Sequence, residues 1–450
     1  MTGPLWAPSL DDVAQANLTR FIADAGDRAS VAVRDYAELY AWSIARPAEF
    51  WGAVWDFCGI VSDRDANGAA WRSVVIGADR VAPPDPDRGP RWFDGARLSF
   101  TENLLRFRDD HAAIVSWNEL GAQRRLTYAQ LYEEVTRLAA ALREHGVRVG
   151  DRVAGFMPNI PETVVAMLAT ASIGAIWSSC SPDFGVQGVF DRFGQIEPRI
   201  LFCADGYRYA GKEIDSLRTV KRIAEQVSTI ERVVVVSYLR DEPAVSVVPR
   251  AVRYSDFIAG SEARALELPR FPFNHPLYVM YSSGTTGLPK CMVHGAGGTL
   301  LQHQKEHVLH CDIGRDDRVF YFTTCGWMMW NWLVSALAAG PTIVLYDGAP
   351  LLRRGAILWD MAEAERITVF GTSAKWLALA EKEGLNPRAT HDLSSLESIL
   401  STGSPLAAHS FDYVYEHVKR DVRLSSISGG TDLISCFALG NPIGPVWRGE

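Results

Sequence analysis

The chain has 450 residues, of which 48% are hydrophobic and 22% are charged, and its formal net charge is −8. This composition is typical of a soluble globular protein with two or three domains or subdomains. The acidic balance, without a long basic run, argues against nucleic acid as the main partner.

Targeting signals are not evident in the sequence. The N-terminal residues MTGPLWAPSLDD contain neither a basic nor a hydrophobic stretch, so we predict no signal peptide. Seven scattered cysteines without a C-x-x-C pair indicate reduced, buried thiols in a cytoplasmic protein. The uncharged stretch 319–346 is long enough to span a bilayer, but its polar residues and a Gly340-Pro341 break divide it into strand, buried helix and strand. We therefore predict no membrane partner.

Residues 1–109 are predicted to form an N-terminal helical extension. Residues 35–55 carry hydrophobic side chains at helical spacing, and a proline-rich link follows at 83–90. This region contains no group of candidate catalytic residues, so we expect it to serve packing.

From residue 110 onward, short hydrophobic strands alternate with helical patterns. Such βα repeats predict mostly parallel sheets covered by helices, with ligands at the carboxyl ends of the strands. The predicted strands are 112–117, 152–157, 175–179, 199–204, 232–236, 319–323, 342–346, 368–370, 396–400 and 422–425, and the predicted helices are 128–144, 161–171, 297–310, 327–339, 355–365, 374–382 and 406–418.

The stretch YSSGTTGLPK at 281–290 lies between two short predicted strands. Small residues let backbone N–H groups approach an anion, and hydroxyls and a lysine add further phosphate contacts. It is not the usual P-loop, because Lys290 follows Leu-Pro instead of opening a helix. By composition alone it would be an ordinary surface loop. The full string, however, resembles the signature loop of the acyl-adenylate-forming superfamily, which includes the acyl-CoA synthetases.

The resemblance covers nearly the whole chain and implies an α/β fold. Residues 110–450 would form the large domain of this family, with two helix-covered, mostly parallel sheets, and residues 1–109 resemble the N-terminal segment of acetyl- and acetoacetyl-CoA synthetases. In the family, the position of Glu450 lies inside the large domain. We expect the ribose-binding aspartate and the small C-terminal domain with its catalytic lysine to be absent from this chain, and the chain alone to be impaired in catalysis.

The resemblance also implies an ATP site built from three segments. The signature loop would hold the β- and γ-phosphates, the segment 401–405 would line the adenine, and the segment 428–432 would hold the α-phosphate and Mg²⁺. Lys290 and Thr431 are the catalytic candidates, and Asp432 is the metal ligand, since Mg²⁺ prefers oxygen ligands. The ATP-binding candidates are Ser282, Ser283, Gly284, Thr285, Thr286, Gly287, Lys290, Gly403, Ser404, Pro405, Thr431 and Asp432.

A further set of residues matches the acyl-binding positions of the family. Acetate-using relatives have a tryptophan where this chain has Gly429, so we expect room for an acid larger than acetate. The strings at 322–348 and 428–450 most resemble the acetoacetyl-CoA synthetases. The candidates for the acyl pocket are Trp327, Met328, Met329, Thr402 and Gly429.

The implied function is ATP-dependent activation of acetoacetate to acetoacetyl-AMP and then, with CoA, to acetoacetyl-CoA. The cofactors and substrates would be ATP, Mg²⁺, CoA and acetoacetate. Two alternatives stay open: a CoA synthetase for another short-chain acid, and a catalytically incomplete module that binds nucleotide or acyl-adenylate.

One short pattern points to different chemistry. The pattern H-x-x-E-H at 303–307 is that of one class of zinc peptidase, and His310 and Cys311 follow it. Histidines four residues apart on a helix can bind zinc. Because short patterns arise by chance and this helix directly follows the phosphate loop, we interpret it as a partly exposed helix face.

Overall fold

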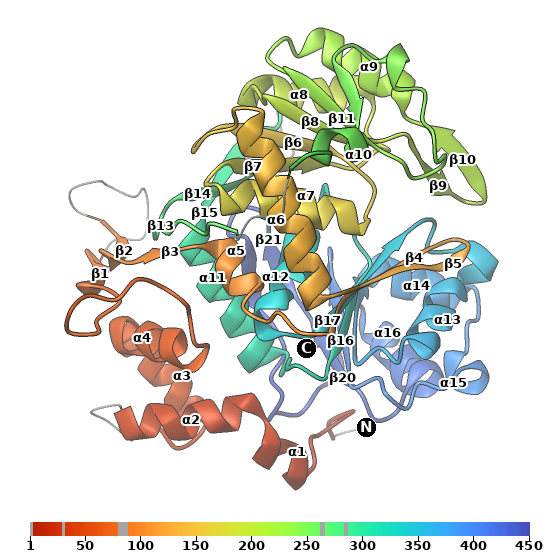
Figure 1. The fold of residues 1–450 in the computed structure, drawn as a ribbon. Coiled ribbons are helices and arrows are strands. Elements are labelled where there is room, and N and C mark those ends of the chain that lie inside the picture. The colour runs from red at the N-terminus through yellow and green to blue at the C-terminus, as the bar shows by residue number, and fades with distance from the viewer. Residues whose placement is uncertain (1–2, 29–31, 80–88, 262–265, 283–286) are drawn as a thin grey trace.

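Two seven-stranded sheets, each covered by helices, dominate the structure (Figure 1). The structure is a computed structural model, and it describes residues 3–28, 32–79, 89–261, 266–282 and 287–450. The first sheet lies in the upper part of Figure 1 and the second in the lower right part. This arrangement confirms the predicted α/β fold with two helix-covered sheets.

The first sheet is parallel except for one antiparallel strand at its edge. Its core strands read as almost continuous hydrophobic runs, because helices bury both faces of the sheet. In spatial order it contains β12 (Ala251–Arg253), β11 (Arg232–Val236), β8 (Ile200–Ala204), β6 (Arg152–Phe156), β7 (Ile176–Cys180), β14 (Pro276–Ser282) and β15 (Lys290–Gly295).

Alternate residues of these strands enter two different cores. Ala154 and Val233 pack with helices α8 (Val186–Ile196) and α9 (Leu217–Gln226). Their neighbours Val153 and Val234 belong to the large core shared with α6 (Tyr128–Glu144), α7 (Pro161–Ser172) and α10 (Tyr254–Ile258). This alternation is the two-residue period of a β-strand.

The second sheet has the same design. It is parallel except for the edge pair β4–β5. In spatial order it contains β20 (Arg423–Ser426), β19 (Ser398–Thr402), β18 (Val369–Ser373), β16 (Arg318–Tyr321), β17 (Thr342–Asp347), β4 (Ala112–Asn118) and β5 (Gly121–Thr127).

Helices also cover both faces of the second sheet. One face packs on α13 (Ile357–Ala364), α14 (Ala374–Lys382), α16 (Ala408–Tyr413) and a π-helical turn, Val414–Val418. The other face contributes to the large core that includes α11 (Ala296–Gln304) and α12 (Met328–Ser335). The large core therefore lies between the two sheets.

The N-terminal part lies at the lower left of Figure 1. Besides its helices it contains an antiparallel strand pair, β1–β2, and a strand that pairs with β13 (Phe271–Pro272). Its elements are α1 (Leu10–Gln15), α2 (Asn17–Arg28), α3 (Tyr36–Ala45), α4 (Pro47–Phe57), β1 (Ser73–Ile76), β2 (Arg91–Asp94), β3 (Arg97–Leu98) and α5 (Phe100–Leu104).

The first described residues are tied to the far end of the sequence. The Leu5 N–H donates to Val446 O at 2.8 Å, and the Val446 N–H donates to Trp6 O at 2.9 Å. The Trp6 indole N–H donates to an oxygen of Asp421 at 2.9 Å. Residues 5–6 are therefore held against residues 421 and 446 by hydrogen bonds.

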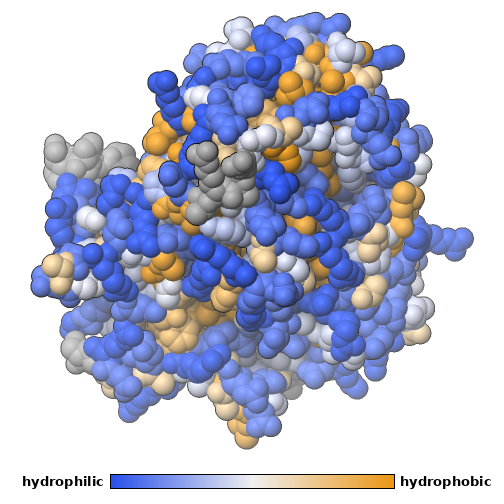
Figure 2. All heavy atoms as spheres, viewed as in Figure 1, coloured by the Kyte–Doolittle hydropathy of each residue, from blue (hydrophilic) through white to orange (hydrophobic). Residues whose placement is uncertain are grey.

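The uncharged stretch 319–346 divides as expected. It contains most of β16 and β17, with α12 and the 3₁₀ turn Ala336–Ala339 between them. In the part of the chain that the structure describes, no helix is both long and apolar enough to cross a membrane. The face in Figure 2 is mostly hydrophilic, with hydrophobic residues in small groups.

All seven cysteines are free. Five are buried, Cys436 is half-buried and Cys291 is exposed. The prediction of buried thiols is therefore wrong for Cys291, which lies on β15 at the edge of the first sheet.

Candidate functional site

Several predicted site segments meet at the carboxyl edge of the second sheet. Strands β16, β19 and β20 are parallel, so the loops that follow them leave the sheet on the same side. These loops enclose a cavity of about 170 Å³, called here the strand-end cavity. Its lining residues are Glu306, Trp327, Met328, Met329, Trp332, Thr402, Gly403, Ile427, Gly429, Gly430, Thr431, Ser435, Cys436 and Leu439.

All five residues expected in the acyl pocket line this cavity, together with two of the ATP-binding candidates, Gly403 and Thr431. Trp327 is 62% exposed, whereas Trp332 is 2% and Glu306 is 1% exposed. The exposed indole of Trp327 therefore lies at the mouth of the cavity, and Glu306 lies at its floor.

Gly429 is constrained by its neighbours. It lies in β21 (Ser428–Gly430), opposite Cys436 of the antiparallel strand β22 (Ser435–Ala438). A Cβ atom at Gly429 would lie 2.3 Å from Ser435 O and 2.5 Å from the Cys436 Cα. With this hairpin in place, position 429 has no room for any side chain, which is a second reason for glycine besides the expected space for a larger acid.

The floor of the cavity is a network of buried polar groups around Glu306. The chain changes from α11 to a π-helical segment, Lys305–His310, and such segments are frequent at functional sites. Glu306 Oε2 accepts a hydrogen bond from the Trp332 indole at 2.8 Å, and Oε1 accepts one from Gln302 at 3.0 Å and another from the Ser435 hydroxyl. The network fastens β22 to the helix.

The electrostatics of this floor favour an ionised carboxylate. Burial acts to raise the pKa of Glu306, but His303, Lys305 and the hydrogen bonds from Ser435 and Trp332 outweigh it and lower the pKa. Sequence reasoning did not assign Glu306 to the acyl site. The only sequence signal for Glu306 was the H-x-x-E-H pattern at 303–307, which indicates zinc chemistry instead of acid binding.

The histidines of that pattern are not on a partly exposed helix face, so that interpretation is wrong. His303 and His307 are both 0% exposed, because their helix lies in the core between the sheets. His303 Nε2 donates to Ile434 O at 2.6 Å, and Nδ1 lies 2.7 Å from Ser335 Oγ. Burial lowers the pKa of both histidines. Among the described residues, no group of three or more potential ligands could hold a metal ion.

The segment predicted to bind phosphate lies between β14 and β15, which pair antiparallel. Ser282 ends β14 and pairs with Lys290, the first residue of β15, whose side chain is exposed. The carbonyl of Pro289 accepts a hydrogen bond from Gln195 at 2.9 Å. Gly287 is described and exposed, whereas the candidates Ser283, Gly284, Thr285 and Thr286 lie outside the described residues.

Strand β15 contacts the third segment predicted to bind ATP, at residues 431–432. His294 of β15 is buried, which lowers its pKa, while a hydrogen bond with the Thr431 backbone and the charge of Asp432 oppose that effect. His294 and residues 431–432 are therefore neighbours. Asp432 is exposed, and an accessible carboxylate fits the preference of Mg²⁺ for oxygen ligands.

The adenine-binding candidates directly follow β19. Gly403 has a φ of 87°, a left-handed conformation that glycine adopts without strain. Gly403, Ser404 and Pro405 are all exposed beside the half-buried Thr402. The turn thus offers backbone groups to a ligand at the edge of the strand-end cavity.

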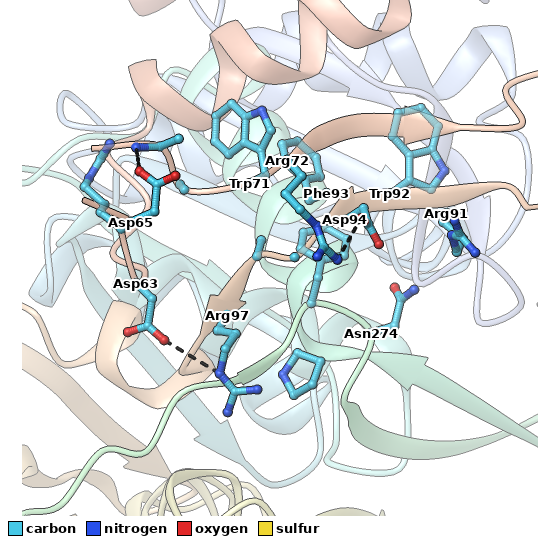
Figure 3. A pocket seen from close by; sticks show the side chains of 17 residues that line it. Asp63, Asp65, Trp71, Arg72, Arg91, Trp92, Phe93, Asp94, Arg97 and Asn274 are labelled. Carbon is cyan, nitrogen blue, oxygen red and sulfur yellow. Dashed lines mark hydrogen bonds and ion pairs between the residues drawn. The ribbon is translucent and has the colours of Figure 1, made fainter. Parts of the chain in front are cut away.

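A larger cavity, of about 640 Å³, lies between the N-terminal part and the segment 272–274 (Figure 3). Sequence reasoning gave no signal for it. Arg72 pairs with Asp94 at 3.0 Å, and Arg97 pairs with Asp63 at 3.7 Å. Because these charged side chains of the cavity wall already pair with one another, they attract a charged ligand less strongly. None of the predicted site residues lines this cavity. We therefore take the strand-end cavity as the candidate functional site.

Comparison with known families defines the class of protein. Residues 100–447 match the family described as AMP-binding enzyme, and this is more than half of the chain. The chain belongs to this family.

Three relatives narrow the comparison. The chain is 50% identical over 448 residues to an acetoacetyl-coenzyme A synthetase of Rhizobium meliloti (strain 1021), covering 99% of this chain and 67% of the relative. It is 45% identical over 453 residues to an acetoacetyl-CoA synthetase of Gallus gallus, covering 99% and 66%. A solved acetoacetyl-CoA synthetase from Streptomyces lividans superposes with a TM-score of 0.91 at 41% identity, covering 100% and 68%. The chain thus spans about two thirds of the length of these relatives, and the resemblance to acetoacetyl-CoA synthetases is confirmed.

Proposed function

We propose that this protein activates acetoacetate with ATP and transfers the acetoacetyl group to CoA. The observation that carries the proposal is the strand-end cavity, where the expected acyl-binding residues adjoin Gly403 and Thr431. The named activity of the relatives supports the choice of acid. Because the chain spans part of those relatives, the proposal concerns the whole protein to which this sequence belongs.

The chemistry has two steps. The carboxylate oxygen of acetoacetate attacks the α-phosphorus of ATP, and a new P–O bond forms as the bond to pyrophosphate breaks. The CoA thiol then loses its proton and attacks the carbonyl carbon of the mixed anhydride, so that AMP leaves with the electron pair of the C–O bond. Neither step needs a nucleophile from the protein.

The residues of the site would act by binding and positioning. Lys290, at the exposed end of the phosphate hairpin, would place a positive charge near the phosphates. Thr431, which lines the cavity, would orient the α-phosphate beside the acid. Asp432 would hold Mg²⁺, which neutralises phosphate charge when it is bound.

The acyl group would lie between Trp327, Met328 and Met329. Indole and thioether side chains give a mostly apolar wall, which favours a short carbon chain over water. Water exclusion would also protect the reactive anhydride from hydrolysis. We place the reaction in the cytoplasm, because free thiols are typical of reducing compartments.

The test is acid-dependent release of pyrophosphate by the full-length gene product with Mg-ATP and CoA. Acetoacetate, acetate, propionate and butyrate would be compared at equal concentrations. We expect the highest kcat/KM with acetoacetate. Preference for one of the other acids would keep the reaction class and overturn the substrate, and no release with any acid would overturn the proposed function.

A further inference from the structure

The floor of the strand-end cavity carries a single charge. Glu306 is the only charged side chain among the described residues that line the cavity; the other lining residues are neutral. Only 1% of Glu306 is exposed, so bulk water does not screen it. A molecule that fills this cavity therefore ends close to a buried carboxylate.

No cation within the described structure neutralises this carboxylate by a direct ion pair. Its oxygens accept hydrogen bonds from neutral donors: the Trp332 indole, the Gln302 amide and the Ser435 hydroxyl. His303 is buried, and its two ring nitrogens face Ser335 and Ile434 instead of the Glu306 carboxylate. The hydrogen bonds stabilise the charge without cancelling it, so its field extends into the cavity.

We propose that Glu306 restricts the substrates to acids whose far end is uncharged, and that it rejects dicarboxylic acids. A second carboxylate at the floor would lose its hydration, find no cation among the described residues that line the cavity, and lie beside a like charge. A neutral methyl ketone loses little hydration and meets no such repulsion. Specificity would thus come from a repulsive group as well as from a fitting shape. This inference deepens the proposed function and rests on it.

Acetoacetate and malonate form a matched pair for the test. They are similar in length, and they differ at the end remote from the reacting carboxylate, where one has a methyl ketone and the other a carboxylate. The experiment measures kcat/KM for both acids, by pyrophosphate release, in the full-length wild-type protein and in Glu306→Gln. Both acids are measured on one preparation, so the folded fraction cancels in the malonate-to-acetoacetate ratio.

We expect this ratio to rise at least about tenfold in Glu306→Gln, which keeps the shape and removes the charge. Glu365→Gln is the matched control, because Glu365 is also buried, with a side chain 2% exposed, but it pairs with Arg125 at 2.5 Å and does not line the cavity. Its ratio should equal that of the wild type. An unchanged ratio in a Glu306→Gln protein that still activates acetoacetate would overturn the inference.

Two further outcomes also test the role of Glu306. If the Gln variant does not fold, the wild-type protein is sufficient: equal kcat/KM for malonate and acetoacetate overturns the inference, and strong discrimination against malonate supports it. If the wild type activates another monocarboxylic acid instead of acetoacetate, the proposed substrate is wrong, and the same ratio is measured for that acid and its ω-carboxylated counterpart.

Discussion

Lys290 lies directly opposite Ser282 in the antiparallel pair of β14 and β15. The backbone position of Lys290 is therefore set by a sheet. A side chain on a strand is held more precisely than one on a free loop. Lys290 therefore has a well-defined backbone position from which to make the phosphate contact proposed above.

Replacement of Lys290 by alanine should reduce acid-dependent pyrophosphate release about 10²-fold, since one electrostatic contact to the developing charge is lost. The measurement is kcat with saturating ATP and acetoacetate. Lys221→Ala on α9 is the control, because that lysine side chain is 52% exposed and lies on a helix that contributes nothing to the cavity. A loss below about threefold in Lys290→Ala would contradict the proposed role.

Two adjacent glycines should respond differently to the same substitution. Gly429→Ala should lower the free energy of unfolding by about 1–3 kcal/mol, because its Cβ would lie 2.3 Å from Ser435 O and would force β22 to move. Gly430→Ala should change it by less than about 0.5 kcal/mol, because no atom lies within 4 Å of the new methyl group. Urea denaturation of both variants checks the difference, and equal losses would refute the packing argument.

The stability of the protein should depend on pH through Asp347. Burial raises its pKa from 3.8 to about 6, although hydrogen bonds from the Tyr238 hydroxyl and the Asn159 N–H oppose the shift. The folded chain therefore keeps a proton that the unfolded chain has released, so stability falls as pH rises from about 4 to about 6.

The variant Asp347→Asn removes this titration. It should be more resistant to urea than the wild type at pH 7, by on the order of 2 kcal/mol, and the difference should shrink toward pH 4. The measurement is urea denaturation at pH values across this window. A difference between the two proteins that does not vary with pH would contradict the assignment.

Glu119 binds the backbone of two other segments, 210–211 and 349. It accepts hydrogen bonds from the N–H groups of Ala210 at 2.6 Å, Gly211 at 2.7 Å and Ala349 at 2.8 Å. Glu119→Ala should cost about 2 kcal/mol of stability, because the Ala349 N–H is buried and loses its partner whereas the other two can bind water. Glu119→Gln keeps an acceptor oxygen and should cost less. Thermal unfolding of the two variants tests this order.

Local patterns predicted much of the fold. Helix α6 begins and ends where expected, because the Thr127 side chain caps its N-terminus and Gln130 completes a capping box. The helices α8 and α9 were not predicted, although both pack a hydrophobic side into the core. Strand β5 was not predicted. Only one of its residues is buried, Gln123 and Arg125 are exposed in its centre, and the strand lies at the edge of the second sheet, so its sequence lacks a hydrophobic pattern.

The candidate site was predictable where residues are close in sequence, and the floor of the cavity was not. The bond between Glu306 and Ser435 joins positions 129 residues apart, and no local pattern contains it. The burial of His303 and His307 likewise follows from the packing of α11 and the π-helical segment that continues it between the sheets. Contacts of this kind depend on tertiary packing, which sequence periodicity does not encode.

The pairing of Trp6 with Val446 has a consequence for biosynthesis. Trp6 receives its strand partner only after the roughly 440 residues that separate it from Val446 have been made. At ~5–20 residues per second, this wait lasts tens of seconds. During that time the Trp6 indole lacks the surface on which it packs in the folded chain, so we expect a nascent-chain chaperone to be most useful for the segment around Trp6.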